Sequence, residues 1–253
     1  MSKLRKTGFN LKPGERLDDL VRNDLKIIQR PGSFCFSIDA VLLANFASVK
    51  KGDLIVDLGT GSGVIPILLT TRQQVDHIIG IDIQAEAVDR AVRSVTGNGL
   101  QGLITIREGD IRNASAELGL GKFDLVTANP PYLPAGQGKI NLNKEIALAR
   151  HELCCSMEDV LREGARLLNS NGRLAMVHRP ERMVDIIFTM KRYGLEPKRL
   201  QLVYPALGKK PNILLIEAIK GAMPGLEALE PLLVYDEQGN YTKELMEIYY
   251  PGR

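Results

Sequence analysis

The stretch LIVDLGTGSGVIPILL, residues 54–69, decides the fold. It opens with a β-branched apolar run, passes through a turn that holds Gly59, Gly61 and Gly63, and closes with an apolar run that suits a helix. Glycine lets the backbone turn sharply and approach a ligand closely, so a strand that enters a helix through such a turn is typical of nucleotide-binding α/β sheets. We therefore expect a cofactor at this turn.

Two carboxylates accompany the turn. Asp57 stands just before it, and Asp82 lies at the end of the next β-like run. A carboxylate at the tip of a second strand accepts hydrogen bonds from both ribose hydroxyls of a nucleoside. The dinucleotide fingerprint is G-x-G-x-x-G, whereas this turn reads G-x-G-x-G, with its third glycine one position early. The pattern therefore favours a nucleoside cofactor other than NAD.

Outward from the turn, short β-branched runs alternate with helical patterns, which predicts a parallel α/β sheet. Strands are expected at residues 54–58, 78–83, 104–106, 123–128 and 173–177. Helices are expected at residues 85–95, 156–168 and 180–193. A capping box of Ser156 and Asp159 opens the second helix, and Asn171-Gly172 closes it. The last two β-like runs, residues 199–204 and 212–219, predict an antiparallel hairpin.

VDLGTGSG, followed by Asp82 and by Gly109-Asp110 after the third strand, resembles the S-adenosylmethionine-dependent methyltransferases of the Rossmann-like class I. The resemblance implies a mostly parallel seven-stranded sheet with an antiparallel C-terminal hairpin, and S-adenosylmethionine as cofactor. It implies that Asp57 and the three glycines line the methionine end and that Asp82 holds the ribose. The adenine would then lie among Ile83, Asp110 and Ile111. Coincidental turns in another α/β fold are the alternative.

The motif Asn129-Pro130-Pro131-Tyr132 follows the fourth predicted strand, at the sheet edge where α/β folds bind ligands. The prolines fix the backbone, so the Asn129 side chain and the Pro130 carbonyl can serve as rigid hydrogen-bond acceptors. Neither group is a base. A conjugated amino nitrogen is a poor nucleophile because its lone pair is delocalised. Two acceptors that bind its hydrogens help to direct this lone pair at a methyl group. Tyr132 offers a flat surface to the π system of the acceptor. A plain strand-end turn is the alternative.

NPPY in this place resembles two branches of amino-methyltransferases, which act on adenine in nucleic acid or on a glutamine amide of release factors. QRPGSFCFSIDAVLL (residues 29–43), ARHE (149–152) and LLVYDEQGNYTKELMEIY (232–249) resemble the bacterial enzymes that methylate an adenine amine beside the anticodon of valine tRNA. Where many relatives carry Gly-Thr-Asp, this chain has Ser37-Ile38-Asp39, so Asp39 is kept only as a cofactor-side contact. The glutamine branch carries a larger helical N-terminal domain, for which this chain has little room.

The amino-acid composition places few further limits on the class of protein. The chain has 253 residues, 44% of them hydrophobic and 25% charged, with a net charge of +3. Its apolar runs fall short of the roughly 18 residues of a membrane span, and it has no secretory signal pattern. The three cysteines, Cys35, Cys154 and Cys155, are expected to be buried free thiols, and His77, His151 and His178 show no metal spacing. We expect a cytoplasmic protein without a metal, and favour a monomer.

Three segments are expected: a partly helical lead-in (residues 1–50), a methyltransferase domain (51–220) and a tail (221–253) that packs on the domain. Basic residues crowd the N-terminus and the predicted hairpin, where they are either tRNA contacts or a solvated face. The expected function is methylation of an adenine amine in tRNA. A glutamine methyltransferase and an idle RNA-binding subunit are the alternatives.

Overall fold

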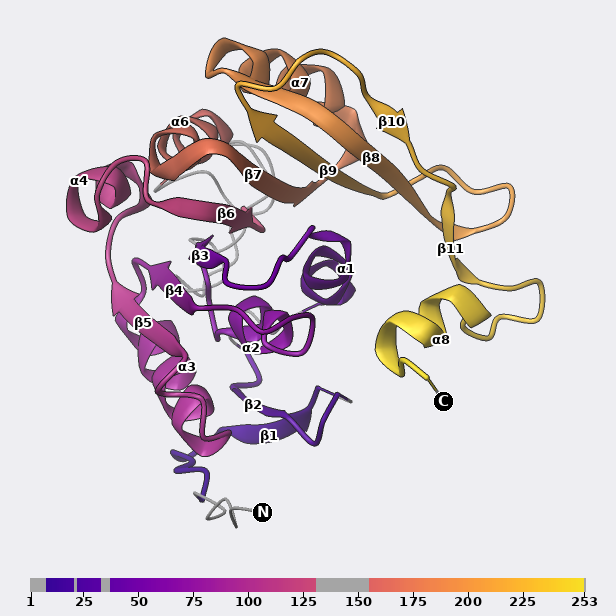
Figure 1. Cartoon of the computed structure of the whole chain (residues 1–253). Helices are drawn as coiled ribbons and strands as arrows, with labels where there is room; N and C mark the ends of the chain where they lie inside the picture. The colour runs from indigo at the N-terminus through magenta and orange to yellow at the C-terminus, as the bar shows by residue number, and fades with distance from the viewer. Residues whose placement is uncertain (1–7, 21, 33–36, 131–154, 253) are drawn as a thin grey trace.

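A computed structural model describes residues 8–20, 22–32, 37–130 and 155–252. Its centre is one sheet (Figure 1). From one edge to the other, seven strands run in the order β5 (Ile104–Glu108), β4 (His77–Asp82), β3 (Leu54–Leu58), β6 (Phe123–Ala128), β7 (Leu168–His178), β9 (Ile213–Lys220) and β8 (Leu195–Ala206). The first five are parallel, and β9 is antiparallel to both β7 and β8. The expected fold class is confirmed.

The strand order places the site. The chain builds the sheet outward from β3 to β4 and β5, and then returns to the other side of β3 with β6. The connections after β3 and β6 therefore leave in opposite directions, and an open parallel sheet binds its ligands at the crevice formed there. Leu58 and Ala128, the last residues of β3 and β6, are register partners. The glycine turn and Asn129 thus begin side by side.

Helices cover both faces of the sheet (Figure 1). On one face lie α1 (Ile38–Phe46), α2 (Val64–Leu69) and α3 (Ala85–Gly97), and on the other lie α4 (Ala114–Leu118), α6 (Met157–Leu167) and α7 (Met183–Arg192). Each layer has its own apolar core, because the buried parallel strands present apolar side chains to both faces. The sheet is therefore held from both sides, which fixes the positions of its strand ends.

The capping box that opens α6 is present. Ser156 Oγ accepts from the Asp159 amide at 3.1 Å, and Asp159 Oδ2 accepts from the Ser156 amide at 3.0 Å. Helix α6 ends at Leu167, within one residue of the predicted range, but the closing role predicted for Asn171-Gly172 is wrong, because β7 already begins at Leu168. Asn171, with φ at 62°, and Gly172 lie within β7, where the register with β6 is interrupted. A left-handed Asn before Gly is typical of a strand bulge as well as of a helix end.

The described residues of the lead-in form the helix α1 and also a hairpin that was not predicted. Strands β1 (Arg16–Asp19) and β2 (Lys26–Gln29) pair antiparallel. Asn23 and Asp24 turn the chain between them with φ of 51° and 56°, a conformation that Asn and Asp tolerate better than other non-glycine residues. Strand β2 packs against α3, on the side of the sheet that carries the glycine turn.

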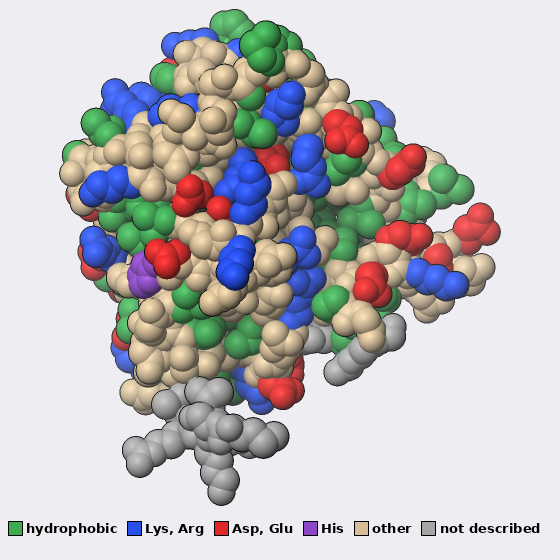
Figure 2. Space-filling model, viewed as in Figure 1, with side chains coloured by type: hydrophobic (Ala, Val, Ile, Leu, Met, Phe, Trp, Pro, Cys, Tyr) green, Lys and Arg blue, Asp and Glu red, His purple; other side chains and the backbone are tan. Residues whose placement is uncertain are grey.

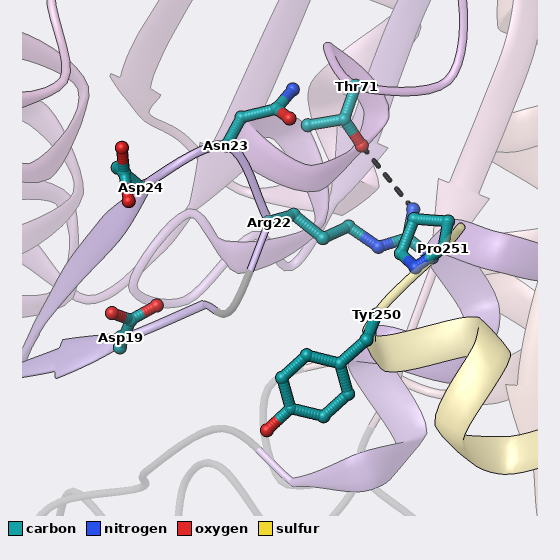
Figure 3. A pocket seen from close by; sticks show the side chains of 7 residues that line it. All are labelled: Asp19, Arg22, Asn23, Asp24, Thr71, Tyr250 and Pro251. Carbon is teal, nitrogen blue, oxygen red and sulfur yellow. Dashed lines mark hydrogen bonds between the residues drawn. The ribbon is translucent and has the colours of Figure 1, made fainter. Parts of the chain in front are cut away.

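The C-terminal segment lies against the edge of the sheet and against the lead-in. Strands β10 (Glu227–Ala228) and β11 (Leu232–Tyr235) pair with β8, which extends the seven strands to nine. Helix α8 (Lys243–Tyr249) packs on α1. The buried Arg22 reaches from the hairpin turn to the Ile248 carbonyl at 3.1 Å and to Thr71 Oγ1 at 3.4 Å, at a surface pocket of about 650 Å³ (Figure 3). The Arg22 side chain therefore joins three separate segments.

No helix among the described residues is long and apolar enough to cross a membrane.

Candidate functional site

The glycine turn sits at the carboxyl end of β3. Gly59, Gly61 and Gly63 have φ of 74°, 55° and 85°, so each adopts the left-handed region that only glycine enters without strain. The amides of Gly59 and Thr60 both donate to the Ile81 carbonyl at 2.9 Å, which ties the turn to the end of β4. Apart from Gly61 and its two chain neighbours, no atom of the described residues lies within 4 Å of where a Gly61 side chain would begin. The turn is thus held at its base and open above.

Asp57 is wholly buried at the end of β3, directly beneath the turn. Its Oδ1 accepts a hydrogen bond from Thr127 Oγ1 at 2.6 Å, whereas its Oδ2 finds no partner among the described residues. Burial raises the pKa of this carboxyl to about 6, although the Thr127 hydrogen bond and the nearby Thr60 side chain oppose the shift. A buried carboxylate with an unsatisfied oxygen is costly, so a ligand donor that reached Oδ2 would stabilise it.

Asp82 ends β4 and is also buried. Its Oδ2 accepts from the Gly61 amide at 2.8 Å and its Oδ1 from the Gln84 amide at 2.9 Å. Burial raises the pKa of this carboxyl, and the two amide hydrogen bonds oppose the shift. Each carboxylate oxygen retains further acceptor capacity beside the turn. The carboxylate therefore braces the glycine turn and can still accept from a ligand.

The end of β5 supplies the next group. Glu108 is the register partner of Asp82, so Gly109 and Asp110 leave the sheet at the same level. The Asp110 carboxylate accepts from the Arg112 amide at 2.9 Å and pairs with the Arg112 guanidinium, which lowers the pKa of this carboxyl. Ile111 approaches the turn, with its Cδ1 3.7 Å from the position of a Cβ at Gly59. Ile83, after β4, is an exposed apolar side chain.

Asn129 and Pro130 follow β6, half-buried and buried respectively. Through the register of β3 with β6 they begin beside the glycine turn. Pro131 and Tyr132 lie outside the described residues, so their positions in the site stay predictions. His151, which was not assigned to the site, also lies outside the described residues. Asp39 is buried in the first turn of α1. The described residues of the predicted site thus gather at the carboxyl ends of four adjacent strands.

The residues present fit the methionine and nucleoside parts of S-adenosylmethionine. The unpaired Oδ2 of Asp57 matches a donor such as an ammonium group, and the open space above Gly61 admits a ligand close to the backbone. Asp82 offers carboxylate oxygens at the next strand tip, and Ile83 and Ile111 offer apolar surface for a planar base. Among the described residues, no cluster of His, Cys, Asp or Glu could hold a metal ion.

The basic residues near the hairpin differ in their partners. Lys191, Arg192 and Arg199 pair with Glu196, Glu158 and Glu217, respectively. In contrast, Lys209 and Lys210 are exposed in the loop after β8 and form no ion pair with any described residue. Because β8 is parallel to β7, this loop lies at the carboxyl edge that also carries the glycine turn.

On the viewed face, acidic side chains gather on the C-terminal segment at the right (Figure 2).

The other singled-out residues have structural surroundings. Cys155 is a free thiol, and burial raises its pKa to about 12, which keeps it protonated and unreactive. Cys35 and Cys154 lie outside the described residues. Burial lowers the pKa of His178 to about 4, and His77 lies 2.9 Å from Thr105 Oγ1. Lys12 and Arg16 pair with Asp89 and Asp18, while Lys3, Arg5 and Lys6 are not described.

Comparison with known proteins gives the family. The methyltransferase small domain family matches residues 24–192. An Aeromonas salmonicida protein named tRNA1(Val) (adenine(37)-N6)-methyltransferase is 30% identical over 215 residues, covering 84% of this chain and 87% of that protein. A protein of the same name from Porphyromonas gingivalis is 28% identical over an alignment that covers 84% of this chain and 86% of that protein.

Among solved structures, a predicted O-methyltransferase from Agrobacterium tumefaciens superposes with a TM-score of 0.67 at 24% identity, covering 83% of this chain and 95% of that one. Fold and site geometry together define a methyltransferase of the Rossmann-like class, for which S-adenosylmethionine is the implied cofactor. The chain belongs to the methyltransferase small domain family.

Proposed function

We propose that this protein transfers the methyl group of S-adenosylmethionine to the exocyclic amine of an adenine in tRNA, beside the anticodon of valine tRNA. The observation that carries the proposal is the match to the tRNA adenine methyltransferases, which extends over 84% of the chain. Asn129 beside the glycine turn supports it, because this places an acceptor for amine hydrogens next to the proposed cofactor. We further propose that the protein acts in the cytoplasm.

In the proposed site, Asp57 Oδ2 accepts from the ammonium group of the cofactor and Asp82 from the ribose hydroxyls. Gly59, Gly61 and Gly63 line the methionine end, and Ile83, Asp110 and Ile111 surround the adenine. Contact of the Asp110 carboxylate with the adenine amine requires it to share or release Arg112. The cofactor supplies an electrophilic methyl group on sulfur.

Asn129 and the Pro130 carbonyl then accept hydrogens of the target amine and direct its nitrogen at that methyl group. Pro131 keeps the motif rigid and Tyr132 stacks on the target base, which must leave its stack to enter the site. The nitrogen gains the methyl group and loses one proton, which passes to solvent. No residue of this motif needs to act as a base.

The test is methyl transfer from labelled cofactor to total tRNA and, in parallel, to a release factor. We expect label in tRNA, with modified adenine recovered after nuclease digestion. Label found only in the release factor would replace the proposal with glutamine methylation. Cofactor binding without transfer to either acceptor would favour the idle RNA-binding subunit.

A further inference from the structure

Gln29 connects the lead-in hairpin to the glycine turn. It is the last residue of β2, its side chain is buried, and its Nε2 donates to the Ser62 hydroxyl at 2.8 Å. Ser62 lies between Gly61 and Gly63, in the second half of the turn. The Ile81 carbonyl therefore holds the start of the turn, the Asp82 carboxylate holds Gly61, and Gln29, a side chain distant in sequence, holds Ser62.

Strand β2 is a firm support for this contact. The Ile28 amide donates to Ser94 Oγ of α3 at 3.0 Å, and Lys26 exchanges two backbone hydrogen bonds with the Asn98 side chain, at 3.0 and 2.7 Å. Helix α3 in turn packs against β4, the strand that ends at Asp82. Gln29 is thus anchored to the same elements that carry the proposed ribose-binding carboxylate.

The turn needs such an anchor because of its composition. Glycines lose more backbone freedom than other residues when they become fixed, so a free turn would order only when the cofactor binds. A turn fixed beforehand avoids that cost and gives tighter binding. Ser62 adds a second effect. Its oxygen accepts from Gln29, so its own hydrogen is directed elsewhere and is available to an acceptor.

We infer that Gln29 is a positioning residue for the amino-acid end of the cofactor. It fixes the glycine turn through Ser62 and leaves the Ser62 hydrogen for the carboxylate of the methionine end. This inference rests on the proposed placement of that end at the turn. It extends the site to a lead-in strand that supplies no other side chain to the proposed cofactor contacts.

The test is calorimetric binding of two ligands to the purified protein. S-adenosylhomocysteine carries the amino-acid end, whereas 5′-methylthioadenosine has the same nucleoside without it. We expect Gln29→Ala and Ser62→Ala each to weaken S-adenosylhomocysteine binding about 5- to 10-fold, and to change 5′-methylthioadenosine binding less than about 2-fold. The double variant should bind about as weakly as Ser62→Ala alone, because the loss of the Ser62 hydroxyl already removes the contact with Gln29.

Three controls make the outcome specific. Gln201→Ala removes a similar hydrogen bond, from Nε2 to the Glu230 carbonyl at 2.9 Å, on the far edge of the sheet and should leave both affinities unchanged. Ser62→Thr keeps the hydroxyl and should retain most of the affinity. Melting temperatures of all variants, measured without ligand, report any loss of fold.

Equal weakening of both ligands by Gln29→Ala, or additive losses in the double variant, would overturn the inference. The proposed function would survive that result if Asp82→Ala still weakens binding of both nucleoside ligands. Failure of the wild-type protein to bind S-adenosylhomocysteine would contradict the inference and the proposed function together.

Discussion

At the scale of single residues, the proposed contact of Asp57 with the ammonium group should make the affinity for the cofactor depend on pH. Its carboxyl, with a pKa of about 6 without ligand, binds an ammonium group only in the charged form. Affinity should therefore rise as the pH rises through 6, and at pH 5 it should be about tenfold below its plateau. Calorimetry with S-adenosylhomocysteine from pH 5 to 8 measures this.

The stability of the ligand-free protein should follow the opposite trend. The folded state raises the pKa of Asp57, so it binds the proton more tightly than the unfolded state does. The stability from this group is complete below pH 4 and is lost as the pH rises through 6. Asp57→Asn should flatten both profiles. An unchanged affinity profile in this variant would contradict the assigned contact.

Asn129 should affect turnover more than cofactor binding. Its side chain is proposed to touch the target amine rather than the cofactor, so Asn129→Ala should leave cofactor affinity within several-fold. Turnover on tRNA should fall about 10²-fold or more, by analogy with the loss of one preorganised polar contact. Single-turnover rates with saturating cofactor measure this. Normal methylation by the variant would exclude the proposed role of the motif.

Tyr132 distinguishes a base from a glutamine as acceptor. Replacement by alanine should remove about 1–3 kcal/mol of stacking on a flipped base, whereas phenylalanine keeps the ring. Tyr132→Phe should therefore retain most activity on tRNA, and Tyr132→Ala should lose most of it. Rates of methyl incorporation into tRNA compare the two. A tRNA signal indifferent to both changes would rule out stacking at this residue.

Some site residues could be read from the sequence and others could not. Asp57, Asp82 and the glycines occupy fixed places relative to one strand and one turn, so local pattern was enough to find them. Thr127 and Gln29 act through contacts that join segments 70 and 33 residues apart. Only alternation along β6 hinted at Thr127, which lies two residues before Asn129 and so on the same side of the strand.

At the scale of elements, the loop after β8 should contribute to RNA affinity. Lys209 and Lys210 are exposed, form no ion pair with described residues and lie at the carboxyl edge of the sheet. Replacement of both by alanine should weaken tRNA binding several-fold and reduce the salt dependence by about one to two phosphate contacts.

Filter binding over a salt series tests this prediction. Lys50 and Lys51 provide a matched control. They are exposed in the turn before β3, at the amino ends of the parallel strands, opposite the carboxyl ends that carry the glycine turn. Their replacement by alanine should leave the salt dependence unchanged. An equal effect of both double variants would mean that net charge, rather than the loop after β8, determines affinity.

Helices and strands were predicted correctly where the hydrophobic periodicity and the flanking turn residues agreed. The prediction failed where the same turn residues are compatible with two kinds of structure. Strands β3 and β6 match the predicted ranges, because each is a β-branched run between polar turns. The sequence Asn171-Gly172 predicts the end of a helix, yet it lies within β7, since the left-handed conformation of Asn171 suits both places. The hairpin of β1 and β2 was not predicted, because its short strands show no clear alternation of apolar and polar residues.

At the scale of the whole molecule, Arg22 should be a strong determinant of stability. Its buried guanidinium joins the lead-in to Thr71, Asn45 and the Ile248 carbonyl. Arg22→Ala removes the donor to the Ile248 carbonyl and to Thr71 Oγ1, while Asn45 Oδ1 keeps the hydrogen bond from Arg72 at 2.8 Å, and it should lower the free energy of unfolding by about 2–4 kcal/mol. Urea denaturation measures the loss.

Arg16→Ala provides the control, because Arg16 forms an exposed ion pair with Asp18 that contributes at most about 1 kcal/mol. A loss from Arg22→Ala no larger than that from Arg16→Ala would show that the C-terminal segment is held by its strands and apolar contacts alone.

The position of β9 between β7 and β8 also governs the order in which the chain can fold during synthesis. The ribosome releases β8 before β9, yet β8 lies outside β9 and has no strand neighbour until β9 has been made. The two strands are close in sequence, so their antiparallel pairing is local and fast, whereas addition of β8 alone is impossible. Translation must therefore deliver the β8–β9 hairpin as a unit, and until then the nascent chain leaves the edge of β7 open to other strands.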